Sequence, residues 1–269
     1  MMDMLIKSAD LNVMVEAVEK AARSLMRDFG EVEQLQVSQK GPADFVSAAD
    51  KRAESIIHRE LSEARPGYGF IMEETGTHKG DSGSPVFVVD PLDGTTNFLH
   101  GLPHWCISVA LVENGATKAA VIYAPVTNEL FYAERGQGAF CDKKKMRVSG
   151  KTNIDAATLL EGEYLPHYPW YEQGLTQSKD LRNKGVTLRR FGAAALDLSY
   201  VAAGRVEGFW ETGIKIWDVA AGILMVEEAK GTVSSMRENK PDPLTSQSIV
   251  ASNTLLHKDL QSILGYVKD

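Results

Sequence analysis

The sequence predicts an α/β (α+β) fold in which helices pack against two β-sheets. Three observations lead to this fold class. Apolar residues recur at helical spacing near both ends of the chain, strand-like apolar runs fill its middle, and strands alternate with helices in its second half. Such an alternation is typical of a second sheet that is flanked by helices.

Two amphipathic helices open the predicted fold. Apolar residues from Leu11 to Phe29 recur at helical spacing and stop at Gly30, a residue type that commonly ends helices. A second helix begins near Ser47 and ends before Pro66. Apolar runs separated by Gly, Asn and Pro then predict a meander of paired strands over 68–72, 86–89, 107–112, 118–123 and 130–133.

In the second half of the chain, strands and helices alternate. The expected strands cover 159–160, 186–191, 206–210 and 248–251, and the expected helices cover 170–182, 194–203, 217–229 and 254–267. The sequence contains no internal repeat and no Pro-rich or Ser-rich linker. We therefore predict one domain over residues 1–269, with two packed halves of approximately 1–150 and 151–269.

The amino-acid composition and charge disfavour several classes of protein. The 269 residues include only two cysteines, Cys106 and Cys141, and residues 1–10 show no signal-peptide pattern, so a cytoplasmic protein is expected. No stretch approaches the roughly 18 consecutive apolar residues that cross a membrane. A net charge of −7 disfavours direct binding of nucleic acid or of an anionic membrane, because such binding needs clustered Lys and Arg.

The most informative segment is the turn that begins at Asp90. Asp90, Asp93 and the carbonyl of Leu92 offer the hard oxygen ligands that divalent cations prefer. The amides of Gly94 and Thr95, which open a predicted helix, suit a phosphate group. A turn that uses its Asp, Gly and Thr side chains only for local hydrogen bonds is the alternative. We predict metal-assisted phosphate chemistry at this segment.

Further carboxylates stand at strand ends or at helix starts. Glu73 and Glu74 follow the apolar run 70–72, which places a carboxylate at the end of a strand. Asp50 and Asp218 lie in the first turns of predicted helices. Each of these residues alone can also be a solvated loop charge or a helix cap. If they converge, their mutual repulsion raises their pKa values unless a divalent cation binds between them.

Two histidines, His100 and His104, lie close to the same turn. They can be imagined as metal ligands, but no Cys or His partner stands at the spacing of a zinc site. We predict that both histidines pack or cap instead.

Three segments together carry a resemblance to a known family. They are the pair Glu73-Glu74, the run Asp90-Pro91-Leu92-Asp93-Gly94-Thr95-Thr96-Asn97-Phe98 and the run Trp217-Asp218-Val219-Ala220-Ala221-Gly222. Segments 44–50 and 191–198 add matches in the same order. The chain resembles the inositol monophosphatase family of magnesium-dependent, lithium-sensitive phosphatases, particularly its bacterial members. The resemblance implies a layered αβαβα sandwich of the inositol monophosphatase/fructose-bisphosphatase type, commonly assembled as a homodimer.

The resemblance also implies two or three Mg²⁺ ions in each active site. A first ion is implied to bind Glu73, Asp90 and the Leu92 carbonyl. A second is implied to bind Asp90, Asp93 and Asp218, so that Asp90 bridges the two. A third, weaker ion is implied near Glu73.

For catalysis, the family resemblance implies attack on phosphorus by a metal-activated water, without a covalent phosphoenzyme. Glu73 and the Thr95 hydroxyl, with Asp50 behind them, are implied to orient that water and to accept its proton. The implied substrate-binding residues are Asp93, Gly94, Thr95, Gly192, Ala194, Glu211 and Asp218.

Several positions depart from the family pattern. Ala193 stands where relatives often have a hydroxyl, residues 161–164 differ from the expected Gly-rich segment, and Lys230 replaces a glycine. Lys40 lies near the position of the family's active-site lysine, but its spacing to the residues that follow is shorter. The sequence therefore determines the chemistry more closely than the substrate.

We predict hydrolysis of inositol 1-phosphate and related polyol phosphomonoesters. Fructose-1,6-bisphosphatase, histidinol-phosphatase and 3'-phosphoadenosine 5'-phosphate phosphatase activities stay open, because pocket residues rather than the metal motif separate them. A regulatory protein that binds the transcription and RNA-processing machinery is the alternative from another class, because some bacterial relatives associate with that machinery.

Overall fold

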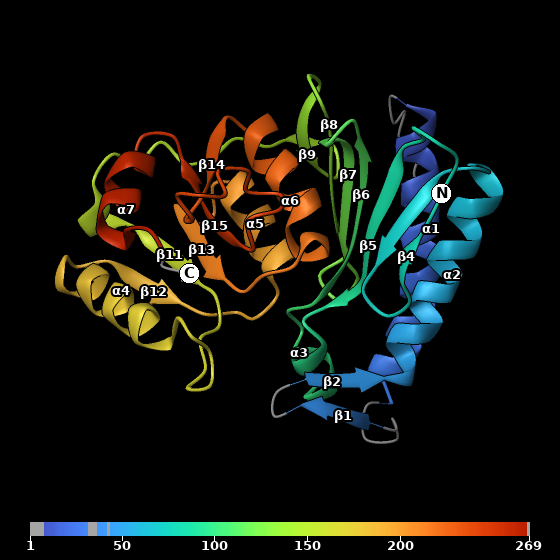
Figure 1. Ribbon diagram of the computed structural model, residues 1–269, viewed down its shortest axis with the longest axis horizontal. Helices are drawn as coiled ribbons and strands as arrows, with labels where there is room; N and C mark the ends of the chain where they lie inside the picture. The colour runs from blue at the N-terminus through green and yellow to red at the C-terminus, as the bar shows by residue number, and fades with distance from the viewer. Residues whose placement is uncertain (1–7, 32–36, 42–43, 268–269) are drawn as a thin grey trace.

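The computed structural model describes residues 8–31, 37–41 and 44–267 (Figure 1). In the strands between residues 37 and 47 it describes the backbone and not the side chains. Its elements form five stacked layers. In order, these are helices α1 (Ala9–Phe29) and α2 (Ala48–Ala64), an eight-stranded sheet, helices α5 (Ala194–Ala202) and α6 (Ile216–Glu228), a five-stranded sheet, and helices α4 (Tyr171–Asn183) and α7 (His257–Leu264). This arrangement confirms the predicted α/β class and the αβαβα sandwich.

The two N-terminal helices cover the outer face of the large sheet. The Ser8 hydroxyl accepts a hydrogen bond from the Leu11 amide at 3.1 Å and caps α1, which ends before Gly30 as predicted. Arg52 of α2 lies 2.6 Å from the buried carboxylate of Asp28 in α1, which ties the helices together. Their apolar faces form one core with the sheet.

A hairpin of β1 (Val37–Gly41) and β2 (Asp44–Ser47) connects α1 to α2 and was not predicted. In Figure 1 it lies beside the short helix α3 (Thr95–Leu99). Lys40 belongs to β1, so its side chain falls outside the described part of the chain and its role stays a prediction.

The large sheet has the strand order β10-β9-β8-β7-β6-β5-β3-β4. From β5 onward the strands pair antiparallel in sequence order, which confirms the predicted meander, whereas β3 pairs parallel with β5. Its strands are β3 (Gly69–Met72), β4 (Gly76–His78), β5 (Val86–Asp93), β6 (Cys106–Glu113), β7 (Ala116–Ala124), β8 (Glu129–Glu134), β9 (Gly138–Cys141) and β10 (Lys144–Lys145).

Strand β5 is longer than predicted. We expected a turn directly after Val89, but the strand continues through Pro91 to Asp93. Its register against β6 shifts between Asp90 and Asp93, and such a bulge lets a strand continue past a proline that cannot donate a ladder hydrogen bond. The bulge changes the direction of the chain at the predicted metal-binding residues.

The second sheet has the order β12-β11-β13-β15-β14 and lies between α5 and α6 on one side and α4 and α7 on the other (Figure 1). Helix α7 is shorter than the expected helix 254–267, because Gly265 at φ 65° ends it. The strands are β11 (Thr158–Glu161), β12 (Thr187–Arg189), β13 (Gly208–Thr212), β14 (Gly231–Ser235) and β15 (Ser248–Asn253), and a 3₁₀ turn, η2 (Ile154–Ala156), precedes β11.

Helices α5 and α6 lie at the centre of the molecule, and their apolar side chains contribute to a core that reaches both sheets. The segment that connects β5 to α3 emerges next to these central helices (Figure 1). In the described part of the chain, none of the helices is long and apolar enough to cross a membrane.

Candidate active site

The candidate site starts where β3 ends beside β5. The two strands run parallel with Met72 opposite Val89, so Glu73, which follows β3, comes next to Asp90 of β5. The Glu73 amide donates a hydrogen bond to the Val89 carbonyl at 3.3 Å, and the carboxyls of Glu73 and Asp90 share a hydrogen bond. The structure therefore brings these two carboxyls together, as predicted, although Asp90 lies within β5 and not after its end.

Burial and mutual repulsion act together on the acidic side chains. Burial raises the pKa of Asp90 well above its ordinary value, and the charges of Glu73, Asp93 and Asp218 raise it further. Burial and then the charge of Asp93 raise the pKa of Asp218 in the same way. For Glu211, burial raises the pKa first and the charge of Asp218 next. Buried carboxyls that repel one another form a place that a divalent cation would stabilise.

Asp93 joins the large sheet to helix α5. Its Oδ2 accepts a hydrogen bond from the Ala195 amide at 2.7 Å, in the first turn of α5. Burial raises the pKa of Asp93 to about 6, although this hydrogen bond acts in the opposite direction. Beside it, His104 Nε2 lies 2.9 Å from Asp197 Oδ1, and the His104 ring packs against Phe191. His104 therefore packs, as predicted, and its pairing with Asp197 was not predicted.

The turn after Asp93 depends on a glycine. Gly94 has φ 92°, a left-handed conformation that favours glycine, and it precedes helix α3. The Thr95 hydroxyl donates a hydrogen bond to the Leu92 carbonyl at 2.9 Å, and the exposed His100 caps the other end of α3. Because α3 has only five residues, its dipole is small. The phosphate-binding role of the Gly94 and Thr95 amides stays a prediction.

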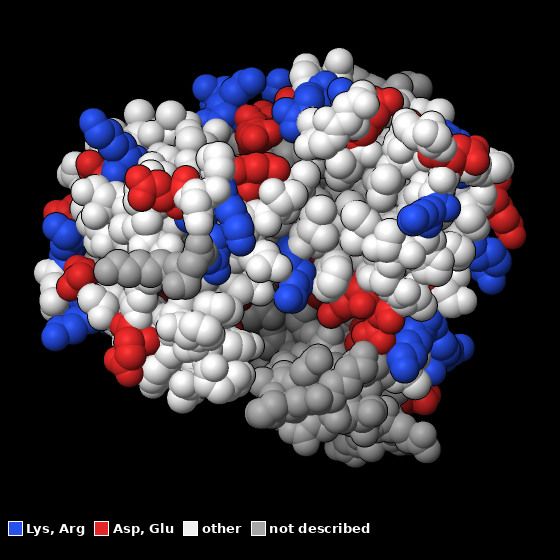
Figure 2. Space-filling model, in the orientation of Figure 1, with Lys and Arg blue, Asp and Glu red and all other residues white. Residues whose placement is uncertain are grey.

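A cavity of about 380 Å³ lies beside Asp93, which is large enough for a small phosphomonoester. Figure 2 shows a hollow in the lower centre of this face. Predicted residues that line the cavity are Asp93, Gly192, Ala194, Glu211 and Asp218. Glu73, Asp90, Leu92, Gly94 and Thr95 are not among the lining residues, so Asp93 and Asp218 connect the cavity to the strand-end carboxyls.

Glu211 and Asp218 reach the cavity from the second half of the chain. Glu211 lies in β13, and its Oε1 accepts a hydrogen bond from the Glu163 amide at 3.3 Å. Asp218 lies in the first turn of α6, where its Oδ2 accepts a hydrogen bond from the Lys215 amide at 2.7 Å. Both carboxyls are therefore held in place by backbone amides.

Asn97 also lines the cavity, and we assigned it no role from sequence. Its Nδ2 donates hydrogen bonds to the carbonyls of His104 and Phe191, each at 2.7 Å. These bonds join the turn after β5 to the segment that carries Gly192, whose φ is 81°. The position of Asn97 inside the Asp90 motif was the available signal. Arg190, which also lines the cavity, had no sequence signal of this kind.

Asp50 and Glu74 are not among the residues that line the cavity. Asp50 is buried in the first turn of α2, at the end of that helix nearest β2 (Figure 1). The Glu74 amide donates a hydrogen bond to Glu54 Oε2 at 2.8 Å, which ties the end of β3 to α2. The predicted role of Asp50 behind Glu73 and Thr95 stays a prediction.

The donor set fits a hard divalent cation, although no three His, Cys, Asp or Glu side chains among the described residues stand in a ligating arrangement. Each predicted Asp ligand instead has an oxygen bound to a backbone amide, at 3.0 Å from Leu92 N in the case of Asp90. Magnesium keeps several waters and needs only one or two carboxylates. The ligand set Glu73, Asp90, Leu92, Asp93 and Asp218 is therefore retained as a prediction.

Comparison with known proteins agrees with this geometry. The model of the inositol monophosphatase family matches residues 7–265. The chain belongs to the inositol monophosphatase family. An inositol-1-monophosphatase from Mesorhizobium japonicum is 50% identical over 256 residues, which span 94% of this chain and 95% of that protein.

Other relatives in the inositol monophosphatase family have a different kind of name. A Nus factor SuhB from Escherichia coli strain K12 is 41% identical over 243 residues, which span 90% of this chain and 91% of that protein. The crystal structure of the extragenic suppressor protein suhB from Bartonella henselae superposes with a TM-score of 0.91 at 49% identity, over 96% of this chain and 98% of that chain. The family match thus covers nearly the whole chain. The names of the relatives point to two kinds of function, a phosphatase and a Nus factor.

Proposed function

We propose that this chain is a cytoplasmic Mg²⁺-dependent phosphatase that hydrolyses inositol 1-phosphate and related polyol phosphomonoesters. The observation that carries the proposal is the cavity of about 380 Å³ in which Asp93, Glu211 and Asp218 meet. Carboxylates accept hydrogen bonds from neighbouring hydroxyls of a polyol, and they bind the cations that a phosphate needs. The name of the relative that is 50% identical supports the same substrate.

The chain's own residues would bind and orient the reactants. Magnesium, when bound, would supply an activated water and neutralise charge on the phosphate. Glu73 lies next to Asp90 and would take a proton, and the Thr95 hydroxyl, now 2.9 Å from the Leu92 carbonyl, would orient the attacking water. Glu211 would bind hydroxyls of the alcohol. Two or three ions in each site and a homodimer belong to the same proposal.

The direct test is phosphate release from inositol 1-phosphate by the purified protein. We expect activity with Mg²⁺ and none after chelation, because the buried carboxyls need the cation to hold a phosphate. Asp93→Asn should lower kcat/KM by about 100-fold or more, since it alters a residue that joins the metal motif to the cavity.

A substrate panel separates the proposed activity from its rivals. The panel contains inositol 1-phosphate, fructose 1,6-bisphosphate, histidinol phosphate and 3'-phosphoadenosine 5'-phosphate. The highest kcat/KM is expected for inositol 1-phosphate. A higher value for any of the other three would reject the proposed substrate while keeping the phosphatase chemistry.

A regulatory role is the second candidate, because relatives that are 40–41% identical are named Nus factor SuhB. In that case the chain binds the transcription and RNA-processing machinery. Lys and Arg side chains are scattered among Asp and Glu on the face shown in Figure 2, which favours a protein partner over direct nucleic-acid binding. In cells that lack the wild-type gene, full function of the inactive Asp93→Asn variant would favour the regulatory role.

A further inference from the structure

We propose that Trp170 is a positioning residue that holds the Glu211 carboxyl through its indole N–H and thereby sets the preference for hydroxyl-bearing phosphomonoesters. The inference rests on the proposed function, because it concerns how the substrate cavity orients its hydroxyl-binding carboxyl. Trp170 stands just before helix α4, at the start of the helix that we expected over 170–182, and we assigned it no functional role from sequence.

Glu211 lines two neighbouring spaces. One is the cavity of about 380 Å³ that also contains Asp93 and Asp218. The other is a small pocket of about 10 Å³ that Trp170 lines. Three residues line both spaces, namely Gly162, Glu163 and Glu211. A volume of this size is about the minimum for one water molecule. A group in the small pocket can therefore act on Glu211 without touching the substrate.

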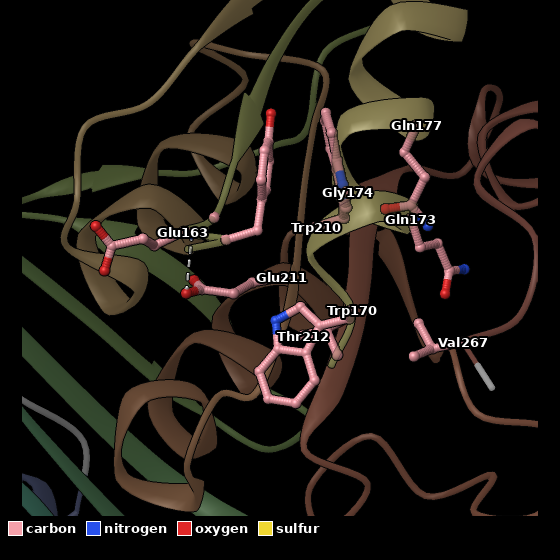
Figure 3. Close-up of a pocket in the computed structure, with 11 residues that line it drawn as sticks. Glu163, Trp170, Gln173, Gly174, Gln177, Trp210, Glu211, Thr212 and Val267 are labelled. Carbon is pink, nitrogen blue, oxygen red and sulfur yellow. Dashed lines mark hydrogen bonds between the residues drawn. The ribbon is translucent and has the colours of Figure 1, made fainter. Parts of the chain in front are cut away.

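Trp170 brings an unused donor to this pocket. Its indole Nε1 is buried and has no hydrogen-bond partner among the residues that the structure describes. A buried N–H without an acceptor costs free energy, so it favours any acceptor within reach. In Figure 3 the indole lies beside the Glu211 side chain, with its nitrogen on the edge that faces Glu211. The Glu211 carboxylate is the charged acceptor that this arrangement offers. Because no direct bond joins the two groups, the link runs through one water in the small pocket.

Glu211 is already held from one side, so a second donor would fix its direction. Its Oε1 accepts a hydrogen bond from the Glu163 amide at 3.3 Å, which is longer than a strong bond to a carboxylate. Burial raises its pKa, and a donor to the carboxylate opposes that rise and favours the ionised form. An ionised, fixed carboxylate is the better acceptor for two hydroxyls of a polyol.

Two glycines make room for the contact. A Cβ on Gly162 would lie 2.2 Å from Glu211 Cγ, so the side chain of Glu211 lies directly against the Gly162 backbone. Gly213 has φ 92°, and a Cβ there would lie 2.3 Å from Trp170 Cζ2. The Trp170 ring also stacks on Tyr168, with ring centroids 5.0 Å apart. The segment that carries Glu211 is thus enclosed between one glycine and the indole.

A spectroscopic test measures the contact itself. The sequence has four tryptophans, and the Trp170 indole signal in a ¹⁵N-labelled sample is identified by its Overhauser contact to Gly213. We expect this N–H to exchange slowly with solvent and to shift when Glu211→Gln is introduced. Rapid exchange, or a signal that Glu211→Gln leaves unchanged, would overturn the proposal. This measurement needs no activity and no altered tryptophan.

A kinetic test measures the effect on substrate preference. Trp170→Phe keeps an aromatic ring and removes the N–H, so KM for inositol 1-phosphate should rise about fivefold with kcat unchanged. KM for phenyl phosphate should not change, because its alcohol part has no hydroxyl for Glu211. In the Glu211→Gln background, Trp170→Phe should add nothing.

The matched control is Tyr171→Phe, which alters the next ring in the chain and does not line the small pocket. It should leave both KM values unchanged. Equal changes for both substrates, or additive effects of Trp170→Phe and Glu211→Gln, would reject the role through Glu211. If the wild-type protein does not hydrolyse inositol 1-phosphate, the proposed function fails, while the spectroscopic test still decides the Trp170–Glu211 contact.

Discussion

At the scale of single residues, Gly94 shows how closely the turn is packed against its surroundings. With φ 92°, a Cβ at this position would lie 2.9 Å from the His104 carbonyl oxygen. This neighbour is backbone and cannot rotate away. We expect Gly94→Ala to lower the free energy of unfolding by about 2–4 kcal/mol, as the sum of left-handed strain and overpacking, measured by urea denaturation.

Gly101→Ala is the matched control for this glycine. Gly101 also has a positive φ, 69°, but a Cβ there would have no atom within 4 Å. Its substitution should cost about 1–2 kcal/mol, which is the strain alone. If both substitutions lower the free energy of unfolding by the same amount, the contact with the His104 carbonyl does not contribute to the loss.

The sequence predicted which acidic residues lie in the candidate site, but it did not predict all of the residues that pair with the site's side chains. Carboxylates at strand ends follow from the apolar runs before them, and for this reason Glu73 and Asp90 were expected to meet. The pairing of His104 with Asp197 joins residues 93 positions apart, and no local pattern encodes such a contact. The hydrogen bond from Asn97 to the Phe191 carbonyl spans 94 positions and was missed for the same reason, although Asn97 itself lies in the Asp90 motif.

At the scale of elements, Glu228 shows a buried carboxylate with a structural role. It ends α6, and its two oxygens accept hydrogen bonds from the amides of Gly136 and Gly138, each at 2.8 Å. These bonds hold the hairpin of β8 and β9 against α6. We expect Glu228→Gln to lower the free energy of unfolding by about 1–3 kcal/mol, because one charged acceptor is lost, without changing KM for inositol 1-phosphate.

The neighbouring Glu227 provides the control for Glu228. Its carboxylate lies 3.1 Å from Arg135. The side chains of Glu227 and Arg135 are 38% and 41% exposed. An exposed ion pair of this kind contributes about 0–1 kcal/mol, so Glu227→Gln should change stability little in thermal or chemical unfolding. A larger loss for Glu227→Gln than for Glu228→Gln would contradict this assignment.

Elements with strong periodicity were predicted, and short polar ones were not. Helices α1 and α2 have long apolar stripes, so their ends agreed closely with prediction. Strands β4, β10 and β14 have few large apolar residues and form because neighbouring strands offer an edge, which is a tertiary effect. The register shift in β5 also depends on its partner β6 and has no signature in the sequence of β5 alone.

At the scale of the whole molecule, the site exists because the two sheets are joined through the central helices. Asp93 comes from the large sheet, Glu211 from the small one and Asp218 from α6. Apolar patterns predicted the three elements that carry these residues but not the relative placement of the sheets. The family resemblance supplied that placement, and the five-layer arrangement in Figure 1 confirms it.

The gathering of buried carboxyls makes the stability of the metal-free protein depend on pH. Burial raises the pKa of Asp93 from 3.8 to about 6, and the pKa values of Asp90 and Asp218 are also raised. An acid with a higher pKa in the folded state binds more protons when folded, so the stability falls as the pH rises from about 4 through 6 and beyond. Without metal, the melting temperature should therefore decrease between pH 5 and pH 8.

Added Mg²⁺ should reverse this loss, because a cation that binds only the folded, ionised site stabilises it. We expect Mg²⁺ to raise the melting temperature more at pH 8 than at pH 5, measured by scanning fluorimetry of protein treated with a chelator. Asp93→Asn removes one of the titrating groups, so it should flatten the pH dependence and weaken the response to Mg²⁺. An equal response to Mg²⁺ in the wild-type protein and in Asp93→Asn at pH 8 would show that this carboxyl does not belong to the cation site.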